Sequence, residues 1–441
     1  MVNLRVWSAA VFRRDANRGM YSTRAAPMTL SRRRFLQMTA AAGGAWCVTR
    51  GFAQSPGSVA GKGSLLHDAA AWQRFRREME RRADSRTALA TEADAWRASR
   101  PITIVGKKML GPTGDPHDYV SIGPYLWPDP AKPDGLPWIT RDGEVNPVFY
   151  DTDNPQLERL CRAVPRLAFQ AEATDSRAHA ERAGQFLRAW FLEPETRMNP
   201  HLRFAQKVPG RADGTPTGII DGTSLIFLAD AASRLPLNAE WTAVHLAGLK
   251  VWFAQYVDWL LTSDNGRLEG ATKNNHGSWY DAQVACLAVF ADRPDVARRQ
   301  VEAATRARIA HQVEPDGRQP EELRRTLSLT YSTYNLLAHA CTARIASGFG
   351  IDLWNWKSAD GRSLRGALQW LLPFYARERP WPHPQIHSFD FSSAAILLNL
   401  ASQGAGDVAL ARVCDAVEEH PWQRLSFSKA SMTGREVPRP D

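Results

Sequence analysis

Apolar side chains recur at helical spacing along most of the chain, where they return every three or four positions between polar ones. The linkers between these segments are short and contain Pro, Gly or Asp, which favour turns. Long runs of alternating β-branched residues, typical of strands, do not occur in the sequence. The pattern predicts an all-α protein with helices at 68–98, 155–173, 177–192, 223–234, 240–262, 278–292, 295–313, 320–346, 361–378, 390–402 and 407–419.

Many helices joined by short turns favour antiparallel pairs, which stack into a solenoid or close into an (α/α) toroid. The sequence has no visible repeat of fixed period, and this argues against a regular helical-repeat array. We therefore expect residues 54–441 to form an incomplete (α/α) toroid with a central cleft. The loop-rich stretches expected to line this cleft are 106–153, 197–221, 264–278 and 380–390.

The first 53 residues have a different pattern from the rest of the chain. Ser31-Arg32-Arg33-Arg34-Phe35-Leu36 precedes a mildly apolar run from Met38 to Val48, and Gly51-Phe52-Ala53 offers small residues for cleavage. This order predicts a twin-arginine signal peptide at 1–53. We therefore expect the protein to be exported to the periplasm and to have no membrane anchor.

The positive charge of the chain is concentrated in this leader. Nine Arg and one Asp in residues 1–53 account for +8 of the formal net charge of +9. The rest of the chain is close to neutral and has no basic stripe with interleaved aromatic residues. Nucleic acid is therefore not an expected partner.

The cysteines after the leader are widely spaced and form no CxxC motif. Cargo of the twin-arginine route usually folds before export, in a reducing compartment. We therefore predict free, buried thiols rather than a disulfide framework at Cys161, Cys286, Cys341 and Cys414.

Two polar stretches carry side chains suited to chemistry. Asn274, Asn275 and His276 stand at the junction between a broken stretch and a helix, where an amide and an imidazole can bind an anion and move a proton. The alternative is that Asn caps the helix and His is structural. About fifty residues later, Arg325 and Tyr331 offer a guanidinium and a phenol.

The helix predicted at 320–346 decides which of these later side chains share a face. Arg325 and Tyr331, six positions apart, would not align perfectly, whereas Arg324 and Tyr331, seven apart, would. An exposed Arg and a buried Tyr without catalytic roles remain the alternative interpretation.

Further candidate residues lie in the loop-rich stretches. Tyr125 and Trp127, bracketed by prolines, could form flat surfaces for sugar rings or a hydrophobic plug. Gln206 and Arg211 lie in a polar stretch, and Arg211 could bind a carboxylate with two hydrogen bonds. His383 has a second histidine four positions later, but the intervening Pro384 forbids a regular helical metal pair, so no metal is expected.

The pattern Asn274-Asn275-His276 with Trp279-Tyr280-Asp281, followed by Glu322-Leu323 to Tyr331, resembles the alginate lyase superfamily of (α/α)-toroid polysaccharide lyases. The similarity also includes Pro124 to Pro147 and Met198 to Gly222, and it covers most of 100–400. The alginate-specific branch has a different continuation after Asn-Asn-His. This chain looks closer to a sister branch that includes glucuronan-cleaving enzymes.

The resemblance implies cleavage of a 1,4-linked polyuronate by β-elimination, without metal or organic cofactor. Asn275 and Arg325 would neutralise the uronate carboxylate, and Tyr331 would move the C5 proton or protonate the leaving O4. His276 is the second candidate base. Because Tyr normally titrates near ~10, this role requires a neighbouring Arg to lower its pKa. The expected substrate-binding residues are Tyr125, Trp127, Gln206, Arg211, Asn274, Arg324 and His383.

Two other functions fit the same helical pattern. A glycoside hydrolase would need two carboxylates on either side of the scissile bond, and the candidates are Asp221, Asp281, Glu321 and Glu322. A periplasmic polysaccharide-binding protein would keep the cleft without turnover. The product distinguishes the three functions, because only elimination creates a conjugated double bond that absorbs ultraviolet light.

Overall fold

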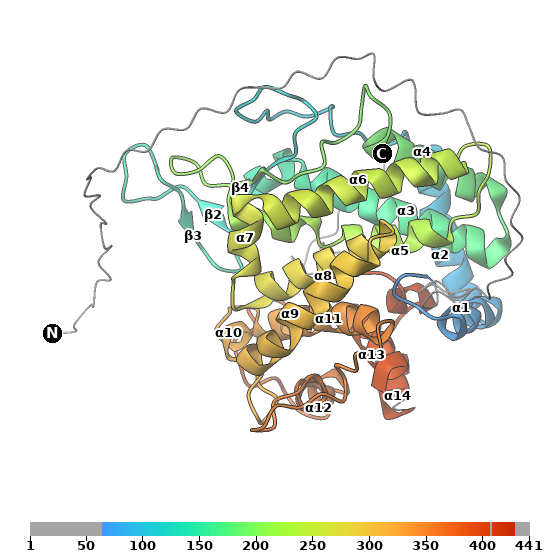
Figure 1. Ribbon diagram of the computed structural model, residues 1–441, viewed down its shortest axis with the longest axis vertical. Coiled ribbons are helices and arrows are strands. Elements are labelled where there is room, and N and C mark those ends of the chain that lie inside the picture. Colours follow the sequence, from blue (N-terminus) through green and yellow to red (C-terminus); the bar gives the residue numbers. More distant parts are fainter. Residues whose placement is uncertain (1–63, 406–407, 428–441) are drawn as a thin grey trace, which may run out of the picture. The chain divides into compact units, whose positions relative to one another are not determined.

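The computed structural model describes residues 64–405 and 408–427, which belong to one compact unit, Ser58–Asp441 (Figure 1). The predicted signal peptide lies outside these residues. The helices are α1 (Ala69–Arg81), α2 (Ala83–Ala98), α3 (Asn154–Thr174), α4 (Arg177–Phe191), α5 (Leu225–Arg234), α6 (Ala243–Thr262), α7 (Asp264–Gly270), α8 (Asn275–Phe290), α9 (Pro294–Gln312), α10 (Pro320–Leu323), α11 (Ser328–Ser347), α12 (Leu364–Tyr375), α13 (Ser392–Ala405) and α14 (Val408–Val417).

The helical prediction is confirmed, because helices account for most of the described residues. Several of them begin where the sequence supplies a capping side chain, as Asp68 does for α1 and Thr242 for α6. The predicted helix 68–98 is instead two helices, α1 and α2. Arg82 between them has extended backbone angles, φ −100° and ψ 94°, and these end the first helix.

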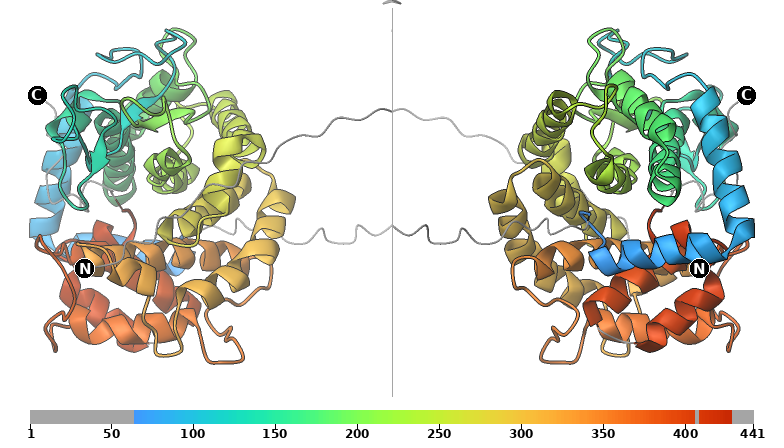
Figure 2. Two further views of the ribbon diagram at one scale, coloured as in Figure 1. Left: turned by 90° about the vertical axis from the view of Figure 1, so that its left-hand side faces the viewer. Right: turned by 90° about the vertical axis from the view of Figure 1, so that its right-hand side faces the viewer.

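The helices form an inner and an outer set. The inner helices α3, α5, α8, α11 and α13 contact one another in this order, and α4, α6, α9, α12 and α14 pack outside them. Helix α1 and the 3-10 helix η3 (Pro421–Arg424) contact α3 and α13, respectively, and each other. Figure 2 shows α3 to α6 gathered at one end of the described unit and α11 to α14 at the other. This succession of helix pairs is that of an all-α toroid.

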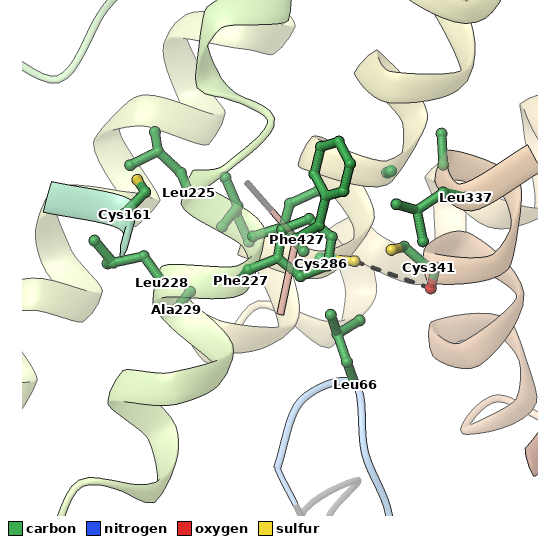
Figure 3. Packing of buried hydrophobic residues seen from close by; sticks show 14 of the residues in the cluster. Leu66, Cys161, Leu225, Phe227, Leu228, Ala229, Cys286, Leu337, Cys341 and Phe427 are labelled. Atoms are coloured by element: carbon green, nitrogen blue, oxygen red, sulfur yellow. Dashed lines mark hydrogen bonds between the residues drawn. The ribbon is translucent and has the colours of Figure 1, made fainter. Parts of the chain in front are cut away.

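Helices α5, α8 and α11 are buried on nearly all sides, so they do not have the polar outer face of a surface helix. In α8, only His276 and Val289 fall outside the buried class. Figure 3 shows the core between α5, α8 and α11, where the Cys286 thiol approaches the Cys341 carbonyl at 4.0 Å. The prediction of free, buried thiols is confirmed for Cys161, Cys286, Cys341 and Cys414.

The predicted helix 320–346 is also wrong as a single element. It consists of the short α10 and the long α11, separated by residues 324–327. In this separating segment, Thr326 accepts a hydrogen bond at 3.0 Å from the backbone of Ile386, and Leu327 forms a β-bridge with Gln385. Tertiary partners thus replace the hydrogen bonds that a continuous helix would make.

Three of the four loop-rich stretches contact one another, and the fourth, 380–390, contacts the segment 324–327. Strand β1 (Val120–Ile122) pairs in parallel with β4 (Phe204–Lys207), which joins 106–153 to 197–221. Two further short strands, β2 (Leu126–Trp127) and β3 (Ile139–Thr140), form an antiparallel pair. The 3-10 helix η2 (Pro216–Gly222) contacts α7, and residues 380–390 reach the segment at 324–327. A further 3-10 helix, η1 (Pro147–Asp151), precedes α3.

Two negative findings concern residues 64–405 and 408–427 alone. We find no helix there with both the length and the hydropathy of a membrane span. Nor do three or more His, Cys, Asp or Glu side chains gather there as ligands for a metal ion.

Candidate active site

The first turn of α8 presents the predicted amide and imidazole. Helix α8 begins at Asn275, three residues earlier than predicted, because Asn274 caps it by accepting a hydrogen bond from the backbone of His276 at 3.2 Å. Asn275 is buried, whereas the His276 side chain keeps 20% of its surface exposed. His276 therefore faces solvent from an otherwise buried helix.

Two buried carboxyl groups hold these side chains in place. Glu322 on α10 accepts hydrogen bonds from the Asn275 backbone nitrogen at 2.7 Å and from its Nδ2 at 2.8 Å. Glu269 on α7 lies 2.6 Å from Nδ1 of His276, and its second oxygen has no hydrogen-bond partner among the residues that the structure describes. Sequence analysis missed both as partners of the site. The sequence offered no signal for either contact beyond the acidic side chain itself, because Glu269 lies in a predicted loop-rich stretch and Glu322 in a predicted helix.

Arg325 lies between an acid and an aromatic ring. Its Nε and Nη2 donate to the Asp142 carboxylate, and its Cζ lies 3.5 Å from the centroid of the Tyr331 ring. Asp142 also accepts from the Thr326 backbone nitrogen at 3.0 Å. Burial favours the protonated form of Asp142, but the hydrogen bonds outweigh burial and hold its pKa below the ordinary value. The arginine orientation is thus set by a residue 183 positions away.

Tyr331, in the first turn of α11, is buried and donates its hydroxyl to the Tyr125 hydroxyl at 3.2 Å. Burial raises the pKa of Tyr331 well above its ordinary value; Tyr125 raises it further, and Arg325 lowers it by less. Arg325 does lower this pKa, but burial raises it by more, so the expectation that a neighbouring Arg brings the pKa of Tyr331 below its ordinary value is wrong. The Tyr331 phenol is protonated at neutral pH in the free protein.

Glu322 and Arg325 connect the four predicted catalytic residues. Asn275 binds its carboxyl group directly, and the Arg325 backbone nitrogen donates to the Glu322 carbonyl at 3.1 Å. Burial raises the pKa of Glu322 to about 7, while hydrogen bonds from Asn275 and the charges of Arg325 and His276 act in the opposite direction. Tyr331 joins the group through its contact with Arg325. These contacts link the four residues in one part of the structure, and their catalytic roles stay a prediction.

The predicted substrate-binding residues divide into two groups. Tyr125 lies at the site through its bond to Tyr331, and Asn274 caps α8. Gln206 donates through Nε2 to Asp221 at 2.9 Å, which connects it to the buried hydrogen bonds beside β1. Trp127 donates to the Glu144 carbonyl and lies under the Arg141 guanidinium at 5.1 Å.

The other three predicted binding residues, like Gln206 and Trp127, have their contacts outside the catalytic cluster. Arg324 is 70% exposed and pairs with Glu321, because the helix that would have aligned it with Tyr331 is interrupted. Arg211 is exposed in the turn after Val208, and His383 packs against Trp381. Arg324 therefore does not share a helical face with Tyr331.

The carboxylates considered for hydrolysis each have other partners. Asp281 is buried and paired with Arg308, and Glu321 pairs with Arg324. Asp221 accepts hydrogen bonds from the hydroxyls of Tyr119 and Ser121 and from Gln206, while Glu322 binds Asn275. We find no opposed pair of free carboxylates among the four, all of which lie in the described ranges.

Comparisons with known proteins bear on the family and the fold of this chain. The model of the alginate lyase family matches residues 103–381. The structure of an alginate lyase from Bacteroides ovatus is 33% identical, with a TM-score of 0.76 over 85% of this chain and 99% of that chain. A search of curated proteins found no match.

A more distant structure shows the same fold. It is the apo form of a histidine-to-alanine variant of alginate lyase A1-III, an enzyme from Sphingomonas species A1. The two chains are 15% identical, with a TM-score of 0.51 over 82% of this chain and 95% of the other. The family match over most of the chain and the 33% identical relative establish that this protein belongs to the alginate lyase family and is a polysaccharide lyase.

Proposed function

We propose that the enzyme cleaves a 1,4-linked polyuronate, with alginate or glucuronan as the substrate, by β-elimination. The observation that carries the proposal is the placement of Arg325, which is fixed between Asp142 and Tyr331 and follows Glu322, the carboxyl partner of Asn275. The name of the Bacteroides ovatus relative supports alginate. The sequence resemblance to the sister branch supports glucuronan.

The carboxylate of the substrate is the chemical obstacle in this reaction. Removing the C5 proton places a second negative charge on a group that is already ionised. Asn275 and Arg325 donate hydrogen bonds to this carboxylate and stabilise the enolate-like intermediate. Donors that are oriented before the reaction cost no reorganisation as the charge develops, so this term is often the largest in catalysis.

Two different side chains carry the protons. Glu269 holds Nδ1 of His276 at 2.6 Å, which leaves Nε2 to accept the C5 proton. Tyr331 is protonated at neutral pH and therefore suits donation to the leaving O4. In this step the C5–H and C4–O4 bonds break and a C4=C5 double bond forms. His276 gains the C5 proton, and O4 gains the phenolic proton of Tyr331.

The products decide between this proposal and its rivals. Alginate, polymannuronate, polyguluronate and glucuronan are each incubated with the purified enzyme. We expect ultraviolet absorbance to rise with at least one polymer, because elimination leaves a conjugated double bond. New reducing ends without that absorbance would indicate hydrolysis, and binding without any product would indicate a non-catalytic protein.

We also propose export by the twin-arginine route to the periplasm, supported by the sequence of residues 1–53. The double substitution Arg32→Lys, Arg33→Lys preserves charge but removes the arginine pair. We expect it to abolish the periplasmic fraction of the enzyme in a bacterium that has the pathway, as measured by cell fractionation. Unchanged export of this variant would refute the proposed route.

A further inference from the structure

Glu322 is a buried carboxyl group that the proposed reaction does not use. It lies on α10 with 1% of its surface exposed, directly beside Asn275. One of its oxygens accepts the Asn275 backbone N–H and the other accepts the side-chain Nδ2. The orientation of the Asn275 amide, proposed above to bind the substrate carboxylate, therefore depends on this single neighbour.

The two protonation states of Glu322 call for opposite orientations of this amide. An ionised carboxylate accepts at both oxygens, so Nδ2 of Asn275 faces Glu322, as the structure shows. A protonated carboxyl group keeps one acceptor for the backbone N–H and offers its O–H as a donor. Turning the amide by 180° then lets Oδ1 accept from Glu322 and directs Nδ2 away from it.

We propose that Glu322 is a positioning residue whose protonated form turns the Asn275 amide so that Nδ2 faces the substrate carboxylate. The inference rests on the proposed function, because it assumes that Asn275 binds this carboxylate. In the ionised state, the amide would instead direct its oxygen towards the substrate, because Nδ2 is held by Glu322. The ionised Glu322 would also add a second negative charge near the substrate carboxylate, on which negative charge develops during the reaction.

The electrostatic surroundings favour the protonated form during binding. Burial raises the pKa of Glu322 to about 7, so both states are populated near neutral pH. The charges of Arg325, in the segment after α10, and of His276 on α8 lower this pKa. Arg325 is paired with Asp142, and His276 is paired with Glu269. A bound uronate brings a further negative charge and raises this pKa further.

The pH dependence of kcat/KM tests the inference, because it reports groups of the free enzyme. For the wild-type enzyme on polymannuronate, we expect kcat/KM to fall about tenfold per pH unit above the Glu322 pKa, since one ionisation removes the active form. Glu322→Gln imitates the neutral acid, with one acceptor and one donor. Its kcat/KM should show no alkaline fall up to about pH 8 and should exceed the wild-type value about tenfold at pH 8.

Glu321→Gln is the matched control, because Glu321 is the preceding residue and forms a surface pair with Arg324. This control should keep the wild-type profile. Two results with folded Glu322→Gln would overturn the inference. One is a loss of about 100-fold or more across the whole pH range, and the other is an unchanged alkaline fall.

Proton uptake provides a second measurement that needs neither turnover nor a Glu322 variant. Calorimetric binding of polymannuronate oligosaccharides is measured in buffers of different ionisation enthalpy, with the variant Tyr331→Phe, His276→Gln, which lacks the imidazole. We expect proton uptake at pH 8, and its absence would reject the inference. If no polymer gives an unsaturated product, the proposed function fails, whereas proton uptake still reports on Glu322.

Discussion

Tyr331→Phe is expected to reduce kcat by about 10²–10⁴-fold, the usual contribution of a positioned acid or base. The substitution removes one hydroxyl group and leaves the ring that packs under the Arg325 guanidinium. The lost contact within the protein is the hydrogen bond to Tyr125, so the fold should remain intact. The rate of ultraviolet absorbance increase measures the effect, and circular dichroism verifies folding.

Tyr334→Phe is the matched control for this substitution. Tyr334 lies three residues later on α11, is also buried, and contacts the Thr223 hydroxyl at 3.1 Å. The control removes the same atoms from the same helix without touching the cluster around Arg325. If Tyr331→Phe turned over within threefold of the wild type, Tyr331 would not carry the proton.

Arg325→Ala should lower kcat by about 10²–10³-fold, as expected when one donor to a developing negative charge is removed. Two of its three guanidinium nitrogens bind Asp142, so Nη1 is the nitrogen left for the substrate. Because this contact strengthens as charge develops, kcat should fall more than KM rises. Steady-state kinetics on the preferred polymer measures both quantities.

Arg324→Ala provides the control for charge alone, since Arg324 is the adjacent residue but is exposed and paired with Glu321. It should change kcat less than about twofold. Arg325→Lys keeps the charge but cannot form the two-pronged contact with Asp142, so we expect partial recovery. Equal losses in Arg324→Ala and Arg325→Ala would mean that net charge matters rather than the fixed guanidinium.

The sequence predicted the local features of the fold, namely its helical segments. Periodic apolar positions predicted the helices, and Asn274 was in place as the cap of α8. The errors occur where tertiary hydrogen bonds override helical periodicity. At Thr326, contacts with Asp142 and Ile386 interrupt a segment whose residues otherwise favour a helix.

The candidate site was predicted by residue type but not by its supporting contacts. Asn275 contacts Glu322 and Arg325 contacts Tyr331, although Arg325 and Tyr331 lie in different parts of the segment that was predicted as one helix. Glu269 was not identified as a partner because nothing in a helical pattern shows which side chain a buried acid will meet. Such pairs form between segments far apart in the chain.

The sequence by itself determined the helical class, the family resemblance and the chemical groups available to the site, because these depend on residue types and local spacing. Only the tertiary structure decided how those groups are oriented and ionised. Asp142 fixes Arg325, Glu322 fixes Asn275, and burial keeps the Tyr331 phenol protonated. Orientation and pKa depend on neighbours and solvent exclusion, and both are set by packing between distant segments.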